Sequence, residues 1–326
     1  MRIKLAPDDT RIDFMGMRRW SVPLSGALCA LSLLALLIFG LNFGIDFRGG
    51  TMIMAETDGP QPVGVYRDVL GGLDVGDVSV TGVSDPAAEL TGGPQNAVMI
   101  RIEQRVNEAE IAAEAVSEVE NALRAALPTV RFLSVEQVGA KVSGELVQAG
   151  ALAVLLAVCA VLIYIWLRFE WQFAVGAVAA LVHDVLITMG VFAVTALEFN
   201  LSIVAALLTI VGYSLNDTVV VYDRIRENLR RFKTKPLADV LNLSINETLS
   251  RTLMTSATTL VALLSLYILG GEVIRGFTFG MILGVIVGTY SSVFIAALIL
   301  LRLGVVRDQD EGEAGPGVRF GSPEAP

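Results

Sequence analysis

The sequence has few of the residues on which disulfides, metal sites and nucleophilic catalysis depend. Its 326 residues include two cysteines and one histidine. Both cysteines, Cys29 and Cys159, lie within long apolar runs, so a disulfide framework is not expected. The chain contains neither a GxxxxGK[ST] phosphate loop nor an HExxH zinc motif. We therefore predict a protein that is not an enzyme, binds no cofactor or metal, and would draw any work from an ion gradient.

Charge is scarce as well, and this decides the class of protein. Charged residues make up 17% of the chain and hydrophobic residues 54%, and the mean hydropathy is +0.64. An ordinary soluble protein is excluded by such a composition. The first apolar run is too long for a signal peptide and has no small-x-small cleavage site after it. We predict six membrane-spanning helices, each near the length of about 20 residues that crosses a bilayer: Ser21–Leu41, Leu146–Leu167, Phe173–Leu197, Leu201–Tyr222, Leu253–Leu269 and Phe277–Leu303.

Basic residues flank the predicted spans on one face of the membrane. They are Arg11, Arg18, Arg19, Arg168, Arg224, Arg226, Arg230, Arg231, Lys233, Lys235, Arg302 and Arg307. The positive-inside rule makes this face the cytoplasm. The prediction is a cytoplasmic N-terminal segment (1–20), a first span (21–41), an outer domain (42–145), a five-span bundle (146–303) with a cytoplasmic loop at 223–249, and a cytoplasmic tail (304–326). Within that loop, residues 236–251 are expected to lie along the inner membrane surface.

The outer segment 42–145 reads as a small α+β domain. Strands are expected at 49–56, 77–83, 96–103 and 129–139, with helices at 61–72 and 107–127. Asn107 is the expected N-cap of the second helix, with Glu110 three residues on. The order βαββαβ is that of a ferredoxin-like domain. Its acid-rich face either keeps the domain soluble, which we favour, or binds a partner.

One carboxyl group lies inside the fourth apolar run. Asp217 is seven residues deeper than Arg224, about 10 Å at the rise of a helix. A charge at that depth costs a few kcal/mol, so Asp217 should face other helices and be paired or neutral. It either relays protons, which we favour, or joins helices as a polar contact, with Asn216 beside it. Arg251, which enters the fifth run from the same leaflet, either anchors at the interface or is the counter-charge of Asp217.

A second carboxyl group lies near the middle of the third run. Asp184 is thirteen residues beyond Trp171, about 20 Å along a helix. His183 precedes it, and neighbouring side chains leave a helix about 100° apart. We therefore expect that the two do not face one point and hold no metal. A relay pair and a buried histidine beside a polar aspartate both stay open.

Two glycine patterns concern packing. Gly276, Gly280, Gly284 and Gly288 are spaced four apart and continue to Ser292, so we predict a close helix pair. The motif GIDFRGG follows the first span. Its Gly49 and Gly50 would allow a tight turn, while Asp46 and Arg48 either fix the junction to the outer domain or belong to a simple turn.

Four stretches carry a family resemblance: GIDFRGG, LVHDVLITMG, VGYSLNDTVVVYDRIREN and SRTLMTSATTL. They resemble the SecF branch of the SecD/SecF family, part of the bacterial Sec protein-export machinery and of the resistance–nodulation–division superfamily. The resemblance covers nearly all of the chain outside 1–15 and 305–326. It implies a polytopic α-helical protein of the inner membrane that is half of a twelve-span bundle.

The resemblance also implies a function. SecF would pair with SecD and use the proton-motive force to complete polypeptide translocation through the SecYEG channel, with YajC as a further partner. Asp217 and Arg251 would take part in proton transport, and Asp184 and Asn216 have a weaker claim. The alternatives are a passive scaffold for the channel, a half-size efflux pump of the same superfamily, and a protease with an Asp184–Asp217 dyad.

Overall fold

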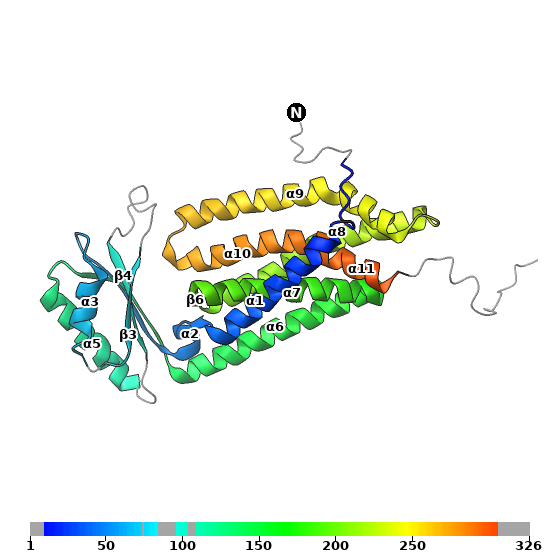
Figure 1. Ribbon diagram of the computed structural model, residues 1–326. Coiled ribbons are helices and arrows are strands. Elements are labelled where there is room, and N and C mark those ends of the chain that lie inside the picture. The colour runs from blue at the N-terminus through cyan, green and yellow to red at the C-terminus, as the bar shows by residue number, and fades with distance from the viewer. Residues whose placement is uncertain (1–9, 74, 84–95, 104–108, 306–326) are drawn as a thin grey trace, which may run out of the picture.

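A computed structural model describes residues 10–73, 75–83, 96–103 and 109–305. It has two parts, a bundle of long helices and a small α/β domain at one end of that bundle (Figure 1). Six helical segments are long and apolar enough to cross a membrane, as predicted. The chain is therefore a multi-pass membrane protein. The segments are α1 (Arg18–Ile38), α6 (Ala140–Arg168), α7 (Trp171–Thr195), α8 (Leu201–Arg231), α9 (Leu237–Leu269) and a last one made of α10 (Glu272–Ser291), the π-helical turn η1 (Ser292–Ala296) and α11 (Ala297–Leu303).

The expected surface segment 236–251 is a wrong prediction. It forms the first turns of α9, which runs without a break from Pro236, its N-cap, to Leu269. Val240, Leu241 and Ile245 are buried there against α8 and the end of α10–α11. The partly helical spacing was read correctly, but its apolar residues face protein and not lipid.

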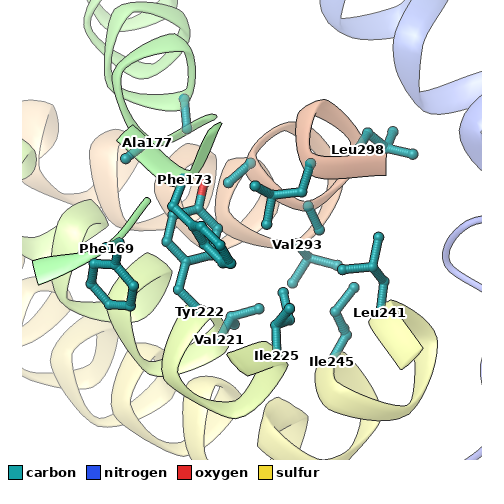
Figure 2. Packing of buried hydrophobic residues seen from close by; sticks show 14 of the residues in the cluster. Phe169, Phe173, Ala177, Val221, Tyr222, Ile225, Leu241, Ile245, Val293 and Leu298 are labelled. Carbon is teal, nitrogen blue, oxygen red and sulfur yellow. The ribbon is translucent and has the colours of Figure 1, made fainter. Parts of the chain in front are cut away.

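The helices differ in how far the bundle buries them. About half of the most apolar stretch of α7, α8 and the α10–α11 segment is buried, whereas that of α6 is not buried at all. One apolar core lies at the α6–α7 turn, where Phe173 and Tyr222 meet edge to face with ring centres 4.9 Å apart (Figure 2). A second core lies nearer the α/β domain around Phe192, Ile203 and Ile210. Helices α7, α8 and α10 are therefore the centre of the bundle, and α6 lies at its edge.

The α/β domain is the predicted ferredoxin-like unit. It consists of β2 (Gly50–Glu56), α3 (Val63–Leu70), β3 (Val78–Val83), β4 (Ala97–Glu103), α5 (Ala109–Ala126) and β5 (Arg131–Val138). The antiparallel sheet has the order β3-β4-β2-β5, with Ile53 opposite Ile100. Both helices cover one face (Figure 1) and bury Tyr66 and Leu123 against it. Asn107 and the Glu110 side chain lie outside the described residues.

Three short elements join the domain to the bundle, and the sequence did not predict them. Strand β1 (Asn42–Phe43) pairs in parallel with β6 (Glu198–Phe199), which lies between α7 and α8. A single helical turn, α2 (Ile45–Arg48), follows β1. Elements of two to four residues are too short to show a periodic pattern.

Candidate functional site

Asp217 is buried in α8, with 2% of its surface exposed. Its neighbours come from α9: Thr255, whose hydroxyl donates to the Thr252 carbonyl at 2.9 Å, and the exposed Arg251, whose charge acts on the carboxyl group. Its Oδ2 atom has no hydrogen-bond partner among the residues that the structure describes. Arg251 therefore acts on Asp217 through its charge, without a direct ion pair in the described part of the chain, and Oδ2 of Asp217 is buried without a partner there.

The other polar residues near Asp217 point elsewhere. Asn216 is exposed on the surface of the bundle. The hydroxyl of Thr258 donates to the carbonyl of Met254 in its own helix, at 2.9 Å.

Asp184, in α7, is completely buried and has a full set of partners. Its Oδ2 accepts hydrogen bonds from Ser214 of α8, at 2.6 Å, and from Ser291 of α10, at 2.7 Å. Gly288 makes room for this arrangement, because a Cβ atom there would lie 3.1 Å from the Cβ of Ser214. Asp184 thus links the three central helices of the bundle.

His183 contacts the carboxyl group of Asp184, contrary to the prediction. Nδ1 of His183 lies 2.9 Å from Oδ1 of Asp184. The two Cβ directions do differ on a helix, but side-chain rotation can bring the ring nitrogen back to its neighbour. Nε2 of His183 has no partner in the described part of the chain. No group of three His, Cys, Asp or Glu residues that could hold a metal occurs in that part either.

The polar network extends from His183 to α1. The imidazole stacks on Tyr290, with ring centres 6.0 Å apart. The hydroxyl of Tyr290 donates to the Ser21 carbonyl at 3.1 Å and lies 2.8 Å from Oγ of Ser25. Asp184 therefore belongs to a connected network over α1, α7, α8 and α10. Among the described residues, the oxygens of Asp184 contact hydroxyl and imidazole groups and no second carboxyl, which argues against an aspartyl dyad.

The glycine ladder of α10 faces α8. A Cβ atom on Gly284 would overlap the Ile210 side chain, whereas one on Gly276 would lie 3.3 Å from the flexible end of Ile203. The ladder ends at η1, directly after Ser291. The sequence analysis did not predict the π-helical turn, and such turns are frequent at functional sites.

The GIDFRGG motif joins the α/β domain to the start of α8. Asp46 accepts a hydrogen bond from the backbone N–H of Leu201, the first residue of α8, at 2.9 Å. Gly49 and Gly50 have φ values of 76° and 137°, which residues with a Cβ atom rarely adopt. Arg48 is the last residue of the helical turn α2 and lies between Asp46 and these two glycines.

A second contact at the junction was not predicted. Arg101, in β4 of the domain, forms an ion pair with Glu198 in β6. Burial raises the pKa of the Glu198 carboxyl group above its usual value, and the charge of Arg101 opposes this shift. Glu198 lies three residues before Leu201, so both junction contacts hold the start of α8.

The sequence matches the family described as protein export membrane protein SecD/SecF, C-terminal, over residues 118–306, and the SecD/SecF GG motif over residues 34–60. The chain belongs to the SecD/SecF family. The GG match contains Gly49 and Gly50, and the longer match contains Asp184, Asp217 and Arg251.

Within this family the chain is similar to SecF proteins along its whole length. It is 52% identical to protein translocase subunit SecF of Cereibacter sphaeroides, and the match covers 99% of both chains. It is 50% identical to protein translocase subunit SecF of Rhodobacter capsulatus, over 95% of this chain and 94% of that one.

The fold is similar to that of a longer SecD/SecF protein. The crystal structure of SecDF from Thermus thermophilus, described as a translocon-associated membrane protein, matches with a TM-score of 0.81 and 34% identity. The match covers 93% of this chain and 40% of the SecDF chain. A SecDF structure in a super-membrane-facing form matches with a TM-score of 0.66 and 32% identity, over 96% of this chain and 41% of that one.

Proposed function

We propose that this protein works with a SecD partner to convert an ion gradient, the proton-motive force, into movement of polypeptide through a SecYEG channel. One observation carries the proposal. A carboxyl group, Asp217, is buried in a membrane-spanning helix within the electrostatic influence of Arg251 and keeps an oxygen without a described partner. Such a group can gain and lose a proton at a modest cost in packing.

In this proposal, Arg251 stabilises the charged form of Asp217, and proton binding removes that attraction. The preferred packing of α8 against α9 then changes with the protonation state. The SecDF chain is more than twice the length covered by this one, which is consistent with a SecD half that completes the bundle. The exposed Asn216 lies next to Asp217 and is available to such a partner.

Movement of α8 would reach the outer domain through the junction. Asp46 and Glu198 both act at the start of α8, and Arg101 belongs to the sheet of the domain. The glycine ladder of α10 would permit a small shift of α8 against it. The domain would move relative to the bundle as α8 moves, and so act on the polypeptide.

Placement in the membrane is part of the proposal. The basic residues at the α6–α7 turn and after α8 support, by the positive-inside rule, a bacterial inner-membrane protein with both termini in the cytoplasm and the α/β domain in the periplasm. YajC is a further expected partner. The energy source is the gradient, with no cofactor or metal.

A passive scaffold is the second candidate function, because buried polar groups would also be needed if they only held the helices together. An efflux pump for small molecules is disfavoured by the sequence similarity along the whole chain to SecF subunits.

The experiment that separates motor from scaffold is export of a secreted precursor in cells whose only copy carries Asp217→Asn. We expect export to fail while membrane level and co-purification with SecD stay normal. Normal export in this variant would favour the passive scaffold over the motor.

A further inference from the structure

A charged pocket lies where α6 ends and the last turns of α8 pass it. It has a volume of about 480 Å³, which is within the range of ligand-binding pockets. Its lining consists of Arg168, Asp223, Arg226, Glu227, Arg230 and Arg231. Four arginines against two carboxylates leave the lining with a net charge of +2. Neither Asp184 nor Asp217 belongs to it, and the pocket is positive enough to attract an anion.

Both carboxylates of the pocket already have a basic partner. Asp223 pairs with Arg168 at 2.9 Å. Glu227 pairs at 2.5 Å with Arg224, which lies outside the lining. Three arginines of the lining form no ion pair in the described part of the chain: Arg226, Arg230 and Arg231. The excess positive charge of the pocket therefore belongs to these three side chains.

An aromatic ring fixes two of the guanidinium groups. Those of Arg168 and Arg226 lie 5.0 and 5.3 Å from the centre of the Phe169 ring, within the range of a cation–π contact. Nη1 of Arg226 also donates to the Arg168 carbonyl at 3.0 Å. Phe169 is itself buried and packs against Tyr222 (Figure 2). Two positive charges are thus held near each other, and an anion that binds beside them reduces their repulsion with little further loss of side-chain freedom.

The pocket lies at the depth of lipid head groups. Trp166 and Trp171, on either side of Arg168 in the sequence, are 68% and 55% exposed, and exposed tryptophans gather at the membrane–water interface. The hydrogen bond to the Arg168 carbonyl places Arg226 at the same level. Arg230 is one helical turn further along α8, about 6 Å. The head-group layer on each side of a bilayer is about 5–7 Å thick, so it contains these arginines.

We propose that this pocket binds the head group of an anionic phospholipid, with its phosphate on the guanidinium groups of Arg226 and Arg230. A planar guanidinium group donates in a fork that matches phosphate oxygens, and basic pockets between membrane helices suit such head groups. A dissolved phosphate ion offers the same oxygen atoms, but a lipid carries its phosphate at this depth. Its chains would lie beside Leu167, which is 81% exposed. The inference does not depend on the proposed ion coupling, because the lining contains neither Asp217 nor Arg251.

The test measures lipid binding to the purified full-length protein in detergent by native mass spectrometry. The probes are phosphatidylglycerol and phosphatidylcholine with the same chains, and inorganic phosphate serves as a competitor. We expect the variant Arg226→Gln/Arg230→Gln to bind phosphatidylglycerol about 25-fold more weakly than the wild type, about five-fold for each basic residue near a membrane surface. Binding of phosphatidylcholine, whose choline group cancels the phosphate charge, should be the same in both proteins.

The matched control is Arg19→Gln/Arg302→Gln, which removes two exposed arginines at the ends of α1 and α11, outside the pocket lining. It should bind phosphatidylglycerol as the wild type does. If the pocket variant fails to fold by circular dichroism, Arg230→Gln alone decides, with an expected five-fold loss, because Arg230 is exposed and has no hydrogen-bond or ring partner among the described residues. An equal loss in the control would show that only net charge matters. Displacement of the lipid by inorganic phosphate would show that the pocket takes a dissolved anion, and either result would overturn the proposal.

Discussion

Two aspartates are buried in the same bundle and are held in opposite ways. Asp184 contacts two hydroxyl groups and an imidazole from three helices. Asp217 feels the charge of Arg251 from one neighbouring helix, and its Oδ2 has no described partner. This difference shows that burial of a carboxyl group does not by itself identify a protonation switch. A carboxyl group with a full set of hydrogen bonds stabilises one packing arrangement. A carboxyl group with an unbonded oxygen can gain or lose a proton, and the packing around it can change with its protonation state.

The largest predicted effect concerns Arg251, whose charge acts on Asp217. Arg251→Met should abolish stimulation of export, because the charged form of Asp217 would lose its counter-charge in the membrane. Arg251→Lys keeps the charge but not the guanidinium fork, and it should retain part of the activity. Export of a precursor, measured at equal membrane levels of the variants, checks this. Full activity of Arg251→Met would show that the charge of Arg251 plays no part in export.

Substitution of Asp184 should lower the stability of the protein. Asp184→Leu leaves Ser214 and Ser291 without their shared acceptor, and we expect it to lower the free energy of unfolding by about 3 kcal/mol. Asp217→Asn, which keeps its shape and breaks no saturated network, is the matched control and should stay within about 1 kcal/mol of the wild type. Thermal or denaturant unfolding in detergent measures both. Similar losses in the two variants would erase the distinction between the sites.

A smaller effect is expected at the contact of α10 with α8. Gly284→Ala would force a methyl group into Ile210 and should cost about 2 kcal/mol. Gly276→Ala is the matched control, since it meets only the flexible end of Ile203, and it should be nearly neutral. The same unfolding measurement applies, with helix content followed by circular dichroism. An equal cost at both positions would mean that the ladder is not packed as described.

The smallest effect lies at the junction, where Glu198 is a partly buried carboxyl group with an ionic partner, Arg101. Its pKa should exceed the ordinary 4.5, since burial outweighs the charge of Arg101, and Arg101→Gln should raise it further. Because the folded state then holds the proton more tightly than the unfolded chain, the contribution of Glu198 to stability is full below about 4.5 and is lost as the pH rises through the raised pKa. Carbon-13 NMR of labelled glutamate gives the titration. A midpoint at or below 4.5 would contradict the geometry.

The sequence predicted the features that repeat or are long. Six spans, the βαββαβ order and the glycine spacing follow from periodicity and length. The β1–β6 pair and the Arg101–Glu198 contact join residues far apart in the chain and leave no local pattern. The His183–Asp184 contact was mispredicted because helix geometry fixes the Cβ direction and not the ring nitrogen. Segment 236–251 was placed on lipid because an apolar helix face looks the same whether lipid or protein covers it.

The measurement that tests the central claim is infrared difference spectroscopy of the carboxyl groups after a pH jump, with the protein and its SecD partner in vesicles. The account predicts an aspartic acid C=O band that appears on acidification, is lost in Asp217→Asn and is retained in Asp184→Asn. A band that persists in Asp217→Asn and disappears in Asp184→Asn would show that the saturated site is the one that takes up the proton, and would contradict the account.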